Sequence, residues 1–369
     1  MQLGRIRLEG FRNYQKAEIS FAGGINVISG ENAQGKTNLL EAVYFLTCGK
    51  SFRAKTDQEV IGFESEFAEI EAEVIQADRT DELFMRLPRG GKKTFSCNGV
   101  KLKSAAELRG RLTAVLFCPD DLKIVREGAA VHRRLMDSVL FQLRPRYASL
   151  ISEFSRLYDR KTRILRDWRE KPSLLDLLED YNLRLAQLGT EILRFRAAFT
   201  EELSKRAAAI HTEFSGGAER LSIAYKTVKT VKDPRNAPPQ EIFEQLMEHQ
   251  HSHYRAEIES GLCLSGVSKD DLEIELNGRP AKNFASQGQT RTAALSIKLA
   301  EREIHFAASG EYPVLLLDDV LSELDAKRQS FVLNHIDEGQ VLITCCEDDG
   351  IRERTNGKVF CVENGSVKA

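Results

Sequence analysis

The stretch "INVISGENAQGKTNLLEAVYFL", residues 25–46, decides the fold of the first part of this chain. Its first five residues are a short apolar run of the kind found in buried strands, and residues 37–46 carry the apolar spacing of a helix. Between them, residues 30–37 match G-x-x-x-x-G-K-[ST] in the strand–loop–helix context that this motif requires. The alternative interpretation is a glycine-containing turn beside a surface lysine. Such a turn does not require a strand before it and a helix after it, so the presence of both favours the phosphate-binding motif. The sequence therefore predicts an α/β domain with a phosphate-binding loop.

Each residue type in this loop has a role in holding a nucleotide triphosphate. Glycines let the backbone curl so that its N–H groups point at the β-phosphate. Lys36 places a positive charge at the β- and γ-phosphates, and the Thr37 hydroxyl ligates Mg²⁺. The residues expected to hold the nucleotide are Gly30, Glu31, Asn32, Ala33, Gln34, Gly35, Lys36 and Thr37.

A second acidic motif lies in "VLLLDDVLSELD", residues 314–325. Asp318 and Asp319 follow an apolar run, residues 314–317, that predicts a buried strand. In proteins with a phosphate-binding loop, a carboxylate at such a strand end holds Mg²⁺, and a second group polarises the attacking water. Two acids here could instead cap the next helix, but the phosphate-binding loop favours the first interpretation. Lys36, Asp318 and Asp319 are the predicted catalytic residues, with Thr37 and Asp318 at Mg²⁺.

A third motif, "NFASQGQTRT" (residues 283–292), directly precedes a strongly helical stretch. Ser286 is an ordinary N-cap residue, but Gly288 in the first turn costs about 1 kcal/mol relative to alanine. At the positive end of a helix, the main-chain N–H groups beside a glycine and a serine hydroxyl can donate hydrogen bonds to an anion. The order of phosphate-binding loop, S-x-G-Q helix start and acid-tipped strand resembles that of ABC-type ATPases. That resemblance implies that Ser286, Gly288 and Gln289 contact ATP held by a second copy of the chain.

Composition narrows the class of protein. The chain has 369 residues, enough for two domains or for one domain with an insertion. Its 53 basic and 55 acidic residues give a net charge of -2, so any basic surface must be local. The seven cysteines include no C-x-x-C pair, which argues against a disulfide framework or a zinc module. Without a long apolar run or an apolar leader, we expect a soluble cytoplasmic protein.

The order of patterns along the chain predicts an α/β body divided by a helical insertion. Residues 1–128 and 236–369 are expected to form an ATPase head, and residues 129–235 a mainly helical domain. Its long amphipathic helices should break at Pro145 and Pro172. After a linker at residues 232–240 we expect two short helices and a hairpin at Asn277 and Gly278.

Five segments together are similar to the RecF family, which is related to SMC heads. They are "LEGFRNY" (8–14), "GENAQGKTNLLEAVYFLTCGKSFR" (30–53), "FCPDDLKIVREGAAVHRRLMD" (117–137), "SQGQTRTAALSIKLAE" (286–301) and "LLLDDVLSELDAKR" (315–328). The resemblance implies an α/β fold, that of an ABC/SMC-like ATPase head with an all-helical insertion. It also implies an ATP-dependent DNA-binding protein with Mg²⁺ as cofactor. Such a protein acts with RecO and RecR at gaps and junctions and helps RecA to load during repair and SOS induction.

The resemblance also implies roles for single residues. Arg12 and Asn13 would flank the nucleotide, and "SELD" (322–325) would be the loop that crosses the interface of an ATP-dependent homodimer. Three departures from the ABC pattern predict slow hydrolysis. Asp319 replaces the usual glutamate, "FCPDDL" offers no glutamine, and cysteines stand where a switch histidine is expected after residue 344.

The helical insertion carries a candidate DNA contact. Arg156, Arg160, Arg163 and Arg166 recur at helical spacing and would form a stripe facing phosphates, although a solvated amphipathic face has the same pattern. Helices of at most about 40 residues, roughly 60 Å, are too short to tether distant DNA segments. A transporter ATPase subunit or a monomeric phosphate-loop enzyme such as a kinase fits less well. The first has a much shorter stretch between the phosphate-binding loop and the S-x-G-Q segment, which here is about 250 residues and carries a helical arm, and the second does not require the "SQGQ" or "SELD" segments.

Overall fold

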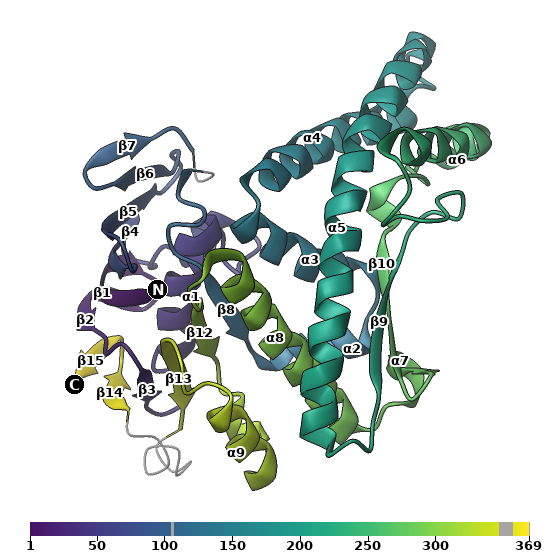
Figure 1. Ribbon diagram of the computed structural model, residues 1–369. Coiled ribbons are helices and arrows are strands. Elements are labelled where there is room, and N and C mark those ends of the chain that lie inside the picture. Colours follow the sequence, from purple (N-terminus) through teal and green to yellow (C-terminus); the bar gives the residue numbers. More distant parts are fainter. Residues whose placement is uncertain (105–106, 347–356, 369) are drawn as a thin grey trace. The chain divides into compact units, whose positions relative to one another are not determined.

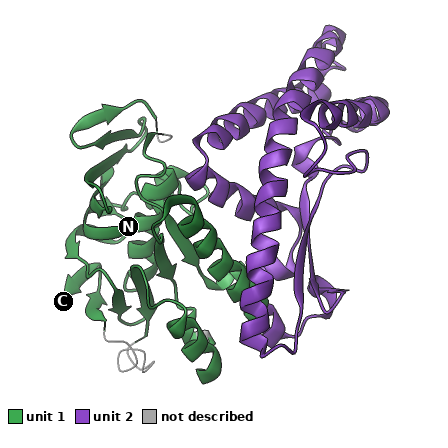
Figure 2. Ribbon diagram, viewed as in Figure 1, with its two compact units in different colours: residues 1–122, 291–369 green, residues 123–290 purple. Residues whose placement is uncertain are grey.

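The computed structural model describes residues 1–104, 107–346 and 357–368 (Figure 1). The chain divides into two compact units (Figure 2). Unit 1 comprises Met1–Leu122 and Arg291–Ala369, and unit 2 comprises Lys123–Thr290. In the part of the chain that is described, no helix has the length and apolarity needed to cross a membrane.

A mainly parallel sheet in unit 1 has the strand order β15-β14-β3-β13-β12-β8. Five of its strands run parallel, and β15 pairs antiparallel with β14. Every residue of β8, β12 and β13 is buried, as expected for a parallel sheet that is covered on both faces. The strands are β3 (Ile25–Ser29), β8 (Ala114–Phe117), β12 (Val314–Leu317), β13 (Val341–Cys345), β14 (Lys358–Glu363) and β15 (Ser366–Lys368).

An antiparallel sheet completes the strands of unit 1, in the order β2-β1-β4-β5-β6-β7. Buried and more exposed residues alternate along β4 and β5, as in a sheet with one solvated face. Cross-strand ion pairs such as Arg7–Glu71 lie on the solvated face. The strands are β1 (Gln2–Phe11), β2 (Tyr14–Ser20), β4 (Phe67–Ile75), β5 (Thr80–Pro88), β6 (Thr94–Cys97) and β7 (Val100–Leu102).

Helix α1 (Lys36–Cys48) lies in the main hydrophobic core of unit 1. Its Leu39, Val43 and Phe45 belong to the same buried cluster as residues of both sheets. The predicted helix at residues 37–46 is therefore confirmed, and it is buried almost all round. Unit 1 also contains most of α8 (Gln287–Ser309), together with α9 (Ala326–Asn334) and the 3-10 turns η1 (Asp57–Val60), η3 (Pro119–Leu122) and η6 (Leu321–Glu323).

Unit 2 consists of long helices and a small sheet of order β11-β10-β9. Pro145 opens α4 and Pro172 opens η4, which confirms the predicted breaks. The helices are α2 (Lys123–Arg126), α3 (Ala129–Leu143), α4 (Pro145–Asp167), α5 (Leu178–Ser215), α6 (Pro239–Ser260) and α7 (Ala281–Phe284), with 3-10 turns η4 (Pro172–Leu177) and η5 (Val267–Lys269). The strands are β9 (Leu221–Lys226), β10 (Asp271–Leu276) and β11 (Arg279–Pro280).

The sheet of unit 2 explains two differences from the sequence analysis. The hairpin at Asn277 and Gly278 is present, with both residues at positive φ, but strand β9 was not predicted. Because β9 pairs with β10 along its whole length, unit 2 extends to Thr290. The sequence instead predicts that the ATPase head resumes at residue 236. The prediction of two short helices after residue 240 is wrong, since α6 is one continuous helix of 22 residues.

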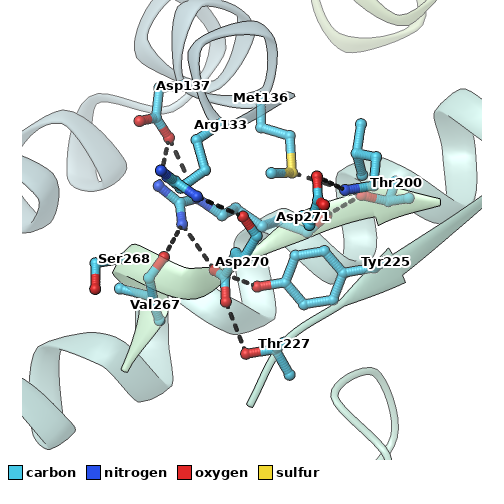
Figure 3. A network of polar contacts seen from close by, with 12 residues as sticks. Arg133, Met136, Asp137, Thr200, Tyr225, Thr227, Val267, Ser268, Asp270 and Asp271 are labelled. Carbon is cyan, nitrogen blue, oxygen red and sulfur yellow. Dashed lines mark hydrogen bonds and ion pairs between the residues drawn. The ribbon is translucent and has the colours of Figure 1, made fainter. Parts of the chain in front are cut away.

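A buried polar network holds the elements of unit 2 together (Figure 3). Arg196 of α5 donates hydrogen bonds of 2.7 Å to Asp270 Oδ2 and 2.8 Å to Asp137 Oδ1. Asp270 also accepts bonds from the hydroxyls of Tyr225 and Thr227. Because a buried charge is costly without partners, this network fixes α3 and α5 against the sheet.

Candidate functional site

The phosphate-binding loop joins β3 to α1, as predicted. Gly30 and Gly35 have φ of 154° and 120°, and Ala33 is left-handed at φ 66°. A Cβ on Gly30 would lie 2.4 Å from the Val362 carbonyl oxygen, and one on Gly35 would lie 2.7 Å from Asn13 Nδ2. Both glycines of the motif are therefore required by backbone angle, and Gly30 also by its close packing against main chain.

Lys36 directs its charge into the loop. Its side chain is buried, and Nζ donates hydrogen bonds of 2.7 Å to the Gly30 carbonyl and 3.1 Å to the Glu31 carbonyl. The ammonium is thus held among the main-chain atoms that curl around the centre of the loop. This is the place where a point charge reaches the β- and γ-phosphates of a nucleotide.

The two predicted acids lie at the same edge of the parallel sheet as the loop. Asp318 Oδ1 accepts hydrogen bonds from the hydroxyls of Thr37 at 2.8 Å and Thr344 at 3.0 Å. Burial raises the pKa of Asp318 and the charge of Asp319 adds to the rise, while the two hydroxyls and Arg53 oppose it. A buried carboxylate beside a hydroxyl is an oxygen donor set that suits Mg²⁺, which usually takes its remaining ligands from water and phosphates.

A cavity of about 220 Å³ opens beside these groups. Its lining includes Arg53 and Asn38, which the sequence analysis did not assign to the site. The residues around it are Asn32, Ala33, Gly35, Lys36, Thr37, Asn38, Arg53 and Asp319. The cavity therefore combines the loop backbone, two basic side chains, a hydroxyl and a carboxylate, which is the chemistry that a nucleotide triphosphate with Mg²⁺ requires.

Arg12 and Asn13 adjoin this cavity but are not part of its lining. Asn13 Nδ2 donates a hydrogen bond of 2.8 Å to the Gln34 carbonyl, and Asn13 Oδ1 accepts one from Asn38. Arg12 forms a two-pronged bond to Glu41, at 2.8 Å and 2.7 Å. Both residues line a larger neighbouring cavity of about 570 Å³. Their predicted place beside a nucleotide thus stays a prediction, with Asn13 in direct contact with the loop.

Glu41 is a site residue that sequence reasoning missed. Its side chain is fully buried and accepts hydrogen bonds from Arg12, Arg53 and Ser51. Burial by itself raises the pKa of Glu41, but these three donors outweigh it and hold the pKa below its usual value. The signal was available in the sequence, because Glu41 is the one charged residue in "NLLEAVYFL". It thereby bonds the Arg53 side chain that lines the cavity.

The S-x-G-Q segment belongs to unit 2 at the start of α8. Ser286 Oγ accepts the Gln289 N–H at 3.2 Å, and Gln289 Oε1 accepts the Ser286 N–H at 2.9 Å. This reciprocal pair is a capping box, so Ser286 is an N-cap as its residue type suggests. Capping uses an oxygen lone pair and leaves the hydroxyl proton able to donate. Gln289 Nε2 also donates to Glu219 Oε1 at 2.8 Å, which holds the side chain in place.

The remaining motif residues support the site less directly. Ser322 donates a hydrogen bond of 2.7 Å to the Asp319 carbonyl, and Asp325 caps α9 by accepting the Arg328 N–H. Asp121 accepts the Cys118 N–H, so it braces its own turn. At the position expected for a switch histidine, Cys346 Sγ lies 3.9 Å from Lys36 Nζ.

The arginine stripe of α4 is exposed, as predicted. No ion pair joins any of these arginines to a carboxylate in the ranges that the structure describes, whereas Arg184 nearby pairs with Glu153 at 2.7 Å. On the opposite face of α4, Lys161 is buried against Glu257 at 2.6 Å. The stripe consists of Arg156, Arg160, Arg163 and Arg166.

Comparisons with known proteins match nearly the whole chain. The family model of the RecF/RecN/SMC N terminal domain matches residues 2–368. DNA replication and repair protein RecF of Listeria innocua is 38% identical over 376 residues, covering all of both chains. The protein of the same name from Acetivibrio thermocellus is 36% identical over 357 residues, 97% of this chain and 96% of its own.

Solved structures give the same result. The recombination mediator protein RecF-ATPrS in the RecFOR pathway is 32% identical, with a TM-score of 0.92 over 100% of this chain and 97% of its own. An SMC head bound to the C-winged helix domain of ScpA is 18% identical, with a TM-score of 0.56 over 100% and 96% of the two chains. The second likeness concerns the fold alone.

Proposed function

The chain belongs to the RecF family of SMC-like ABC ATPases, and from that premise we propose that it is an ATP-dependent, DNA-binding recombination mediator in DNA repair and SOS induction. It binds single-stranded or duplex DNA at gaps or junctions, dimerises on ATP, and promotes RecA loading together with RecO and RecR in the cytoplasm. The names of its relatives support the repair role, and one relative was solved in its ATP form.

The observation that carries the proposal is the convergence of Lys36, Thr37 and Asp319 at one cavity of unit 1, with Asp318 hydrogen-bonded to Thr37. In the proposed head, the loop N–H groups and Lys36 bind the phosphates. Thr37 and Asp318 would hold Mg²⁺, which neutralises phosphate charge when bound. Arg53, held by Glu41, adds a second positive group at the same cavity.

Hydrolysis in this proposal depends on Asp319. Its carboxylate accepts a hydrogen bond from the attacking water and orients it toward the γ-phosphate. An aspartate reaches one methylene less far than the glutamate usual in ABC ATPases, so the water is held less firmly. We therefore propose a slow ATPase, in which hydrolysis ends dimerisation and releases DNA.

The second half of the nucleotide site comes from another copy of the chain. Ser286, Gly288 and Gln289 at the positive end of α8 cap the γ-phosphate bound by the partner. The capping box supports this role, because it fixes the Ser286 oxygen at the helix start. ATP thereby joins two heads.

DNA is bound through its backbone on the exposed stripe of α4. Four arginines without carboxylate partners in the described ranges are free to pair with phosphates. No base-reading motif occurs on this helix, so the contacts are independent of sequence and sensitive to salt.

The alternative is an ABC-type ATPase subunit of another system, such as a transporter. In that class the stretch between the phosphate-binding loop and the S-x-G-Q helix is much shorter, whereas here it includes most of unit 2, Lys123–Thr290. DNA binding that depends on the α4 arginines separates the two functions.

The decisive experiment is light scattering with and without ATP and Mg²⁺, for the wild type, Ser286→Arg and the exposed control Ser252→Arg. The wild type and the control should double in mass only with ATP. Ser286→Arg should bind ATP and stay monomeric, since an arginine blocks the capping position. Dimers of Ser286→Arg would exclude a nucleotide site shared by two copies of the chain. A wild type that stays monomeric with ATP and Mg²⁺ would overturn the proposed ATP-dependent dimer.

A further inference from the structure

Thr344 lies at the end of β13, between the two acids of the site. Its side chain is buried, and its Oγ1 accepts the Asp319 N–H at 2.8 Å. The same hydroxyl is 3.0 Å from Asp318 Oδ1 and 3.3 Å from Asp319 Oδ1. Because a hydroxyl has only one proton, it donates to the nearer Asp318 while it accepts from Asp319. One side chain thus links the main chain of one acid to the carboxylate of the other.

The backbone explains why this contact is needed. The Asp318 N–H still pairs within the sheet, with the Phe117 carbonyl at 2.9 Å. At Asp319 the chain turns out of the sheet with φ 52°, a left-handed conformation that most residues avoid and that aspartate adopts more readily than most. The N–H of Asp319 therefore has no strand partner, and the Thr344 hydroxyl replaces it. The turn that aims Asp319 at the cavity is held by a side chain.

We propose that Thr344 is a positioning residue for nucleotide hydrolysis, which sets the place of the Asp319 carboxylate through the Asp319 N–H. The inference rests on the ATPase function proposed above. Aspartate has one side-chain torsion fewer than glutamate, so the position of its carboxylate depends more closely on the position of its backbone. A group that fixes the Asp319 backbone consequently decides whether the carboxylate reaches the attacking water.

The test compares Thr344→Val, which removes the hydroxyl and keeps the shape, with Thr344→Ser, which keeps the hydroxyl. Thr344→Val should lower kcat for ATP about tenfold or more, with KM changed less than about twofold, because a misplaced group costs turnover rather than binding. Thr344→Ser should keep kcat within about threefold of the wild-type value. Thr344→Ala serves as a second hydroxyl-free variant if the valine variant folds poorly.

A double-mutant cycle separates positioning from general damage. In an Asp319→Asn background the carboxylate is already gone, so Thr344→Val should lower kcat by less than about twofold more. If Thr344→Val lowered kcat by the same factor in the Asp319→Asn background as in the wild type, the inference would be overturned. A wild-type kcat in the single variant Thr344→Val would overturn it as well.

A readout without nucleotide completes the test. Hydrogen–deuterium exchange in the peptide that contains Asp319 should be faster in Thr344→Val and unchanged in Thr344→Ser, because only valine removes the acceptor. Equal protection in all three proteins would refute the contact itself. A wild type that neither binds nor hydrolyses ATP would refute the proposed function, while the exchange result would still decide whether Thr344 holds Asp319.

Discussion

The Thr37 hydroxyl donates a hydrogen bond of 2.8 Å to Asp318 Oδ1, although 281 positions separate the two residues in the chain. They meet because β3 and β12 run parallel on either side of β13, so both strands end at the same edge of the sheet. The contact joins the start of α1 to the acid that follows β12. It makes the phosphate-binding loop and the acidic motif parts of one site.

Replacing Thr37 tests the Mg²⁺ role of this pair. Thr37→Val removes a ligand oxygen, so the gain in ATP affinity that Mg²⁺ provides should fall about tenfold, while binding without Mg²⁺ changes little. Thr37→Ser keeps the hydroxyl and should behave like wild type. Titration with a fluorescent ATP analogue, with and without Mg²⁺, measures the difference. An undiminished Mg²⁺ gain in Thr37→Val would contradict the assignment.

Removing the charge of Lys36 should weaken ATP binding directly. Hydrogen bonds from a charged group contribute about 1.5–3 kcal/mol, so Lys36→Ala should lose roughly 10- to 150-fold in affinity. The exposed Lys101 on β7 provides the control, and Lys101→Ala should bind as the wild type does. Isothermal titration calorimetry measures both affinities. An unchanged affinity in Lys36→Ala would contradict the proposal that this loop binds the phosphates of ATP.

Glu41→Gln should lower stability in a pH-dependent way. The folded pKa of Glu41 is below its usual value, so its contribution is present at neutral pH and is lost as pH falls through that lowered pKa. We expect Glu41→Gln to lose on the order of 2 kcal/mol at pH 7 and much less near pH 3. Urea unfolding at the two pH values measures this, and an equal deficit at both would exclude the ionised pair as the cause.

The α4 arginines should control the salt dependence of DNA binding. Arg160→Gln with Arg163→Gln removes two phosphate contacts, so the slope of log K against log salt should flatten by about 2. The matched control is Arg184→Gln, because that arginine already pairs with Glu153. Fluorescence anisotropy with a duplex and a gapped DNA measures the slope. If the double variant keeps the wild-type slope, the stripe is an ordinary solvated face.

The Arg196 network should dominate the stability of unit 2. Arg196→Met leaves Asp270 buried without its main partner, which should cost about 3–5 kcal/mol. Arg194→Met, on the exposed face of the same helix, should cost less than about 0.5 kcal/mol. Denaturant unfolding compares the two, and similar small losses would show that the network is dispensable.

Local motifs were predictable because their physical causes are local. Gly30 and Gly35 need unusual backbone angles, the proline at 145 sets a helix start, and Asn277 with Gly278 sets a turn. Strand β9 escaped prediction because the strand with which it pairs, β10, lies far along the chain. Thr344 escaped for the same reason, since Asp319 is distant from it in sequence, whereas the isolated charge of Glu41 was a local signal that was overlooked.

The sequence by itself determined which chemical groups this protein has: a phosphate-binding loop with its lysine and threonine, two acids after a buried strand, and a serine at a helix start. Those choices follow from backbone angles and hydrophobic periodicity within a few residues. The tertiary structure alone decided where the groups point. Arg12 and Arg53 share one buried carboxylate, and Thr344 holds Asp319, because burial in a packed core leaves each polar atom only the partners that folding brings to it.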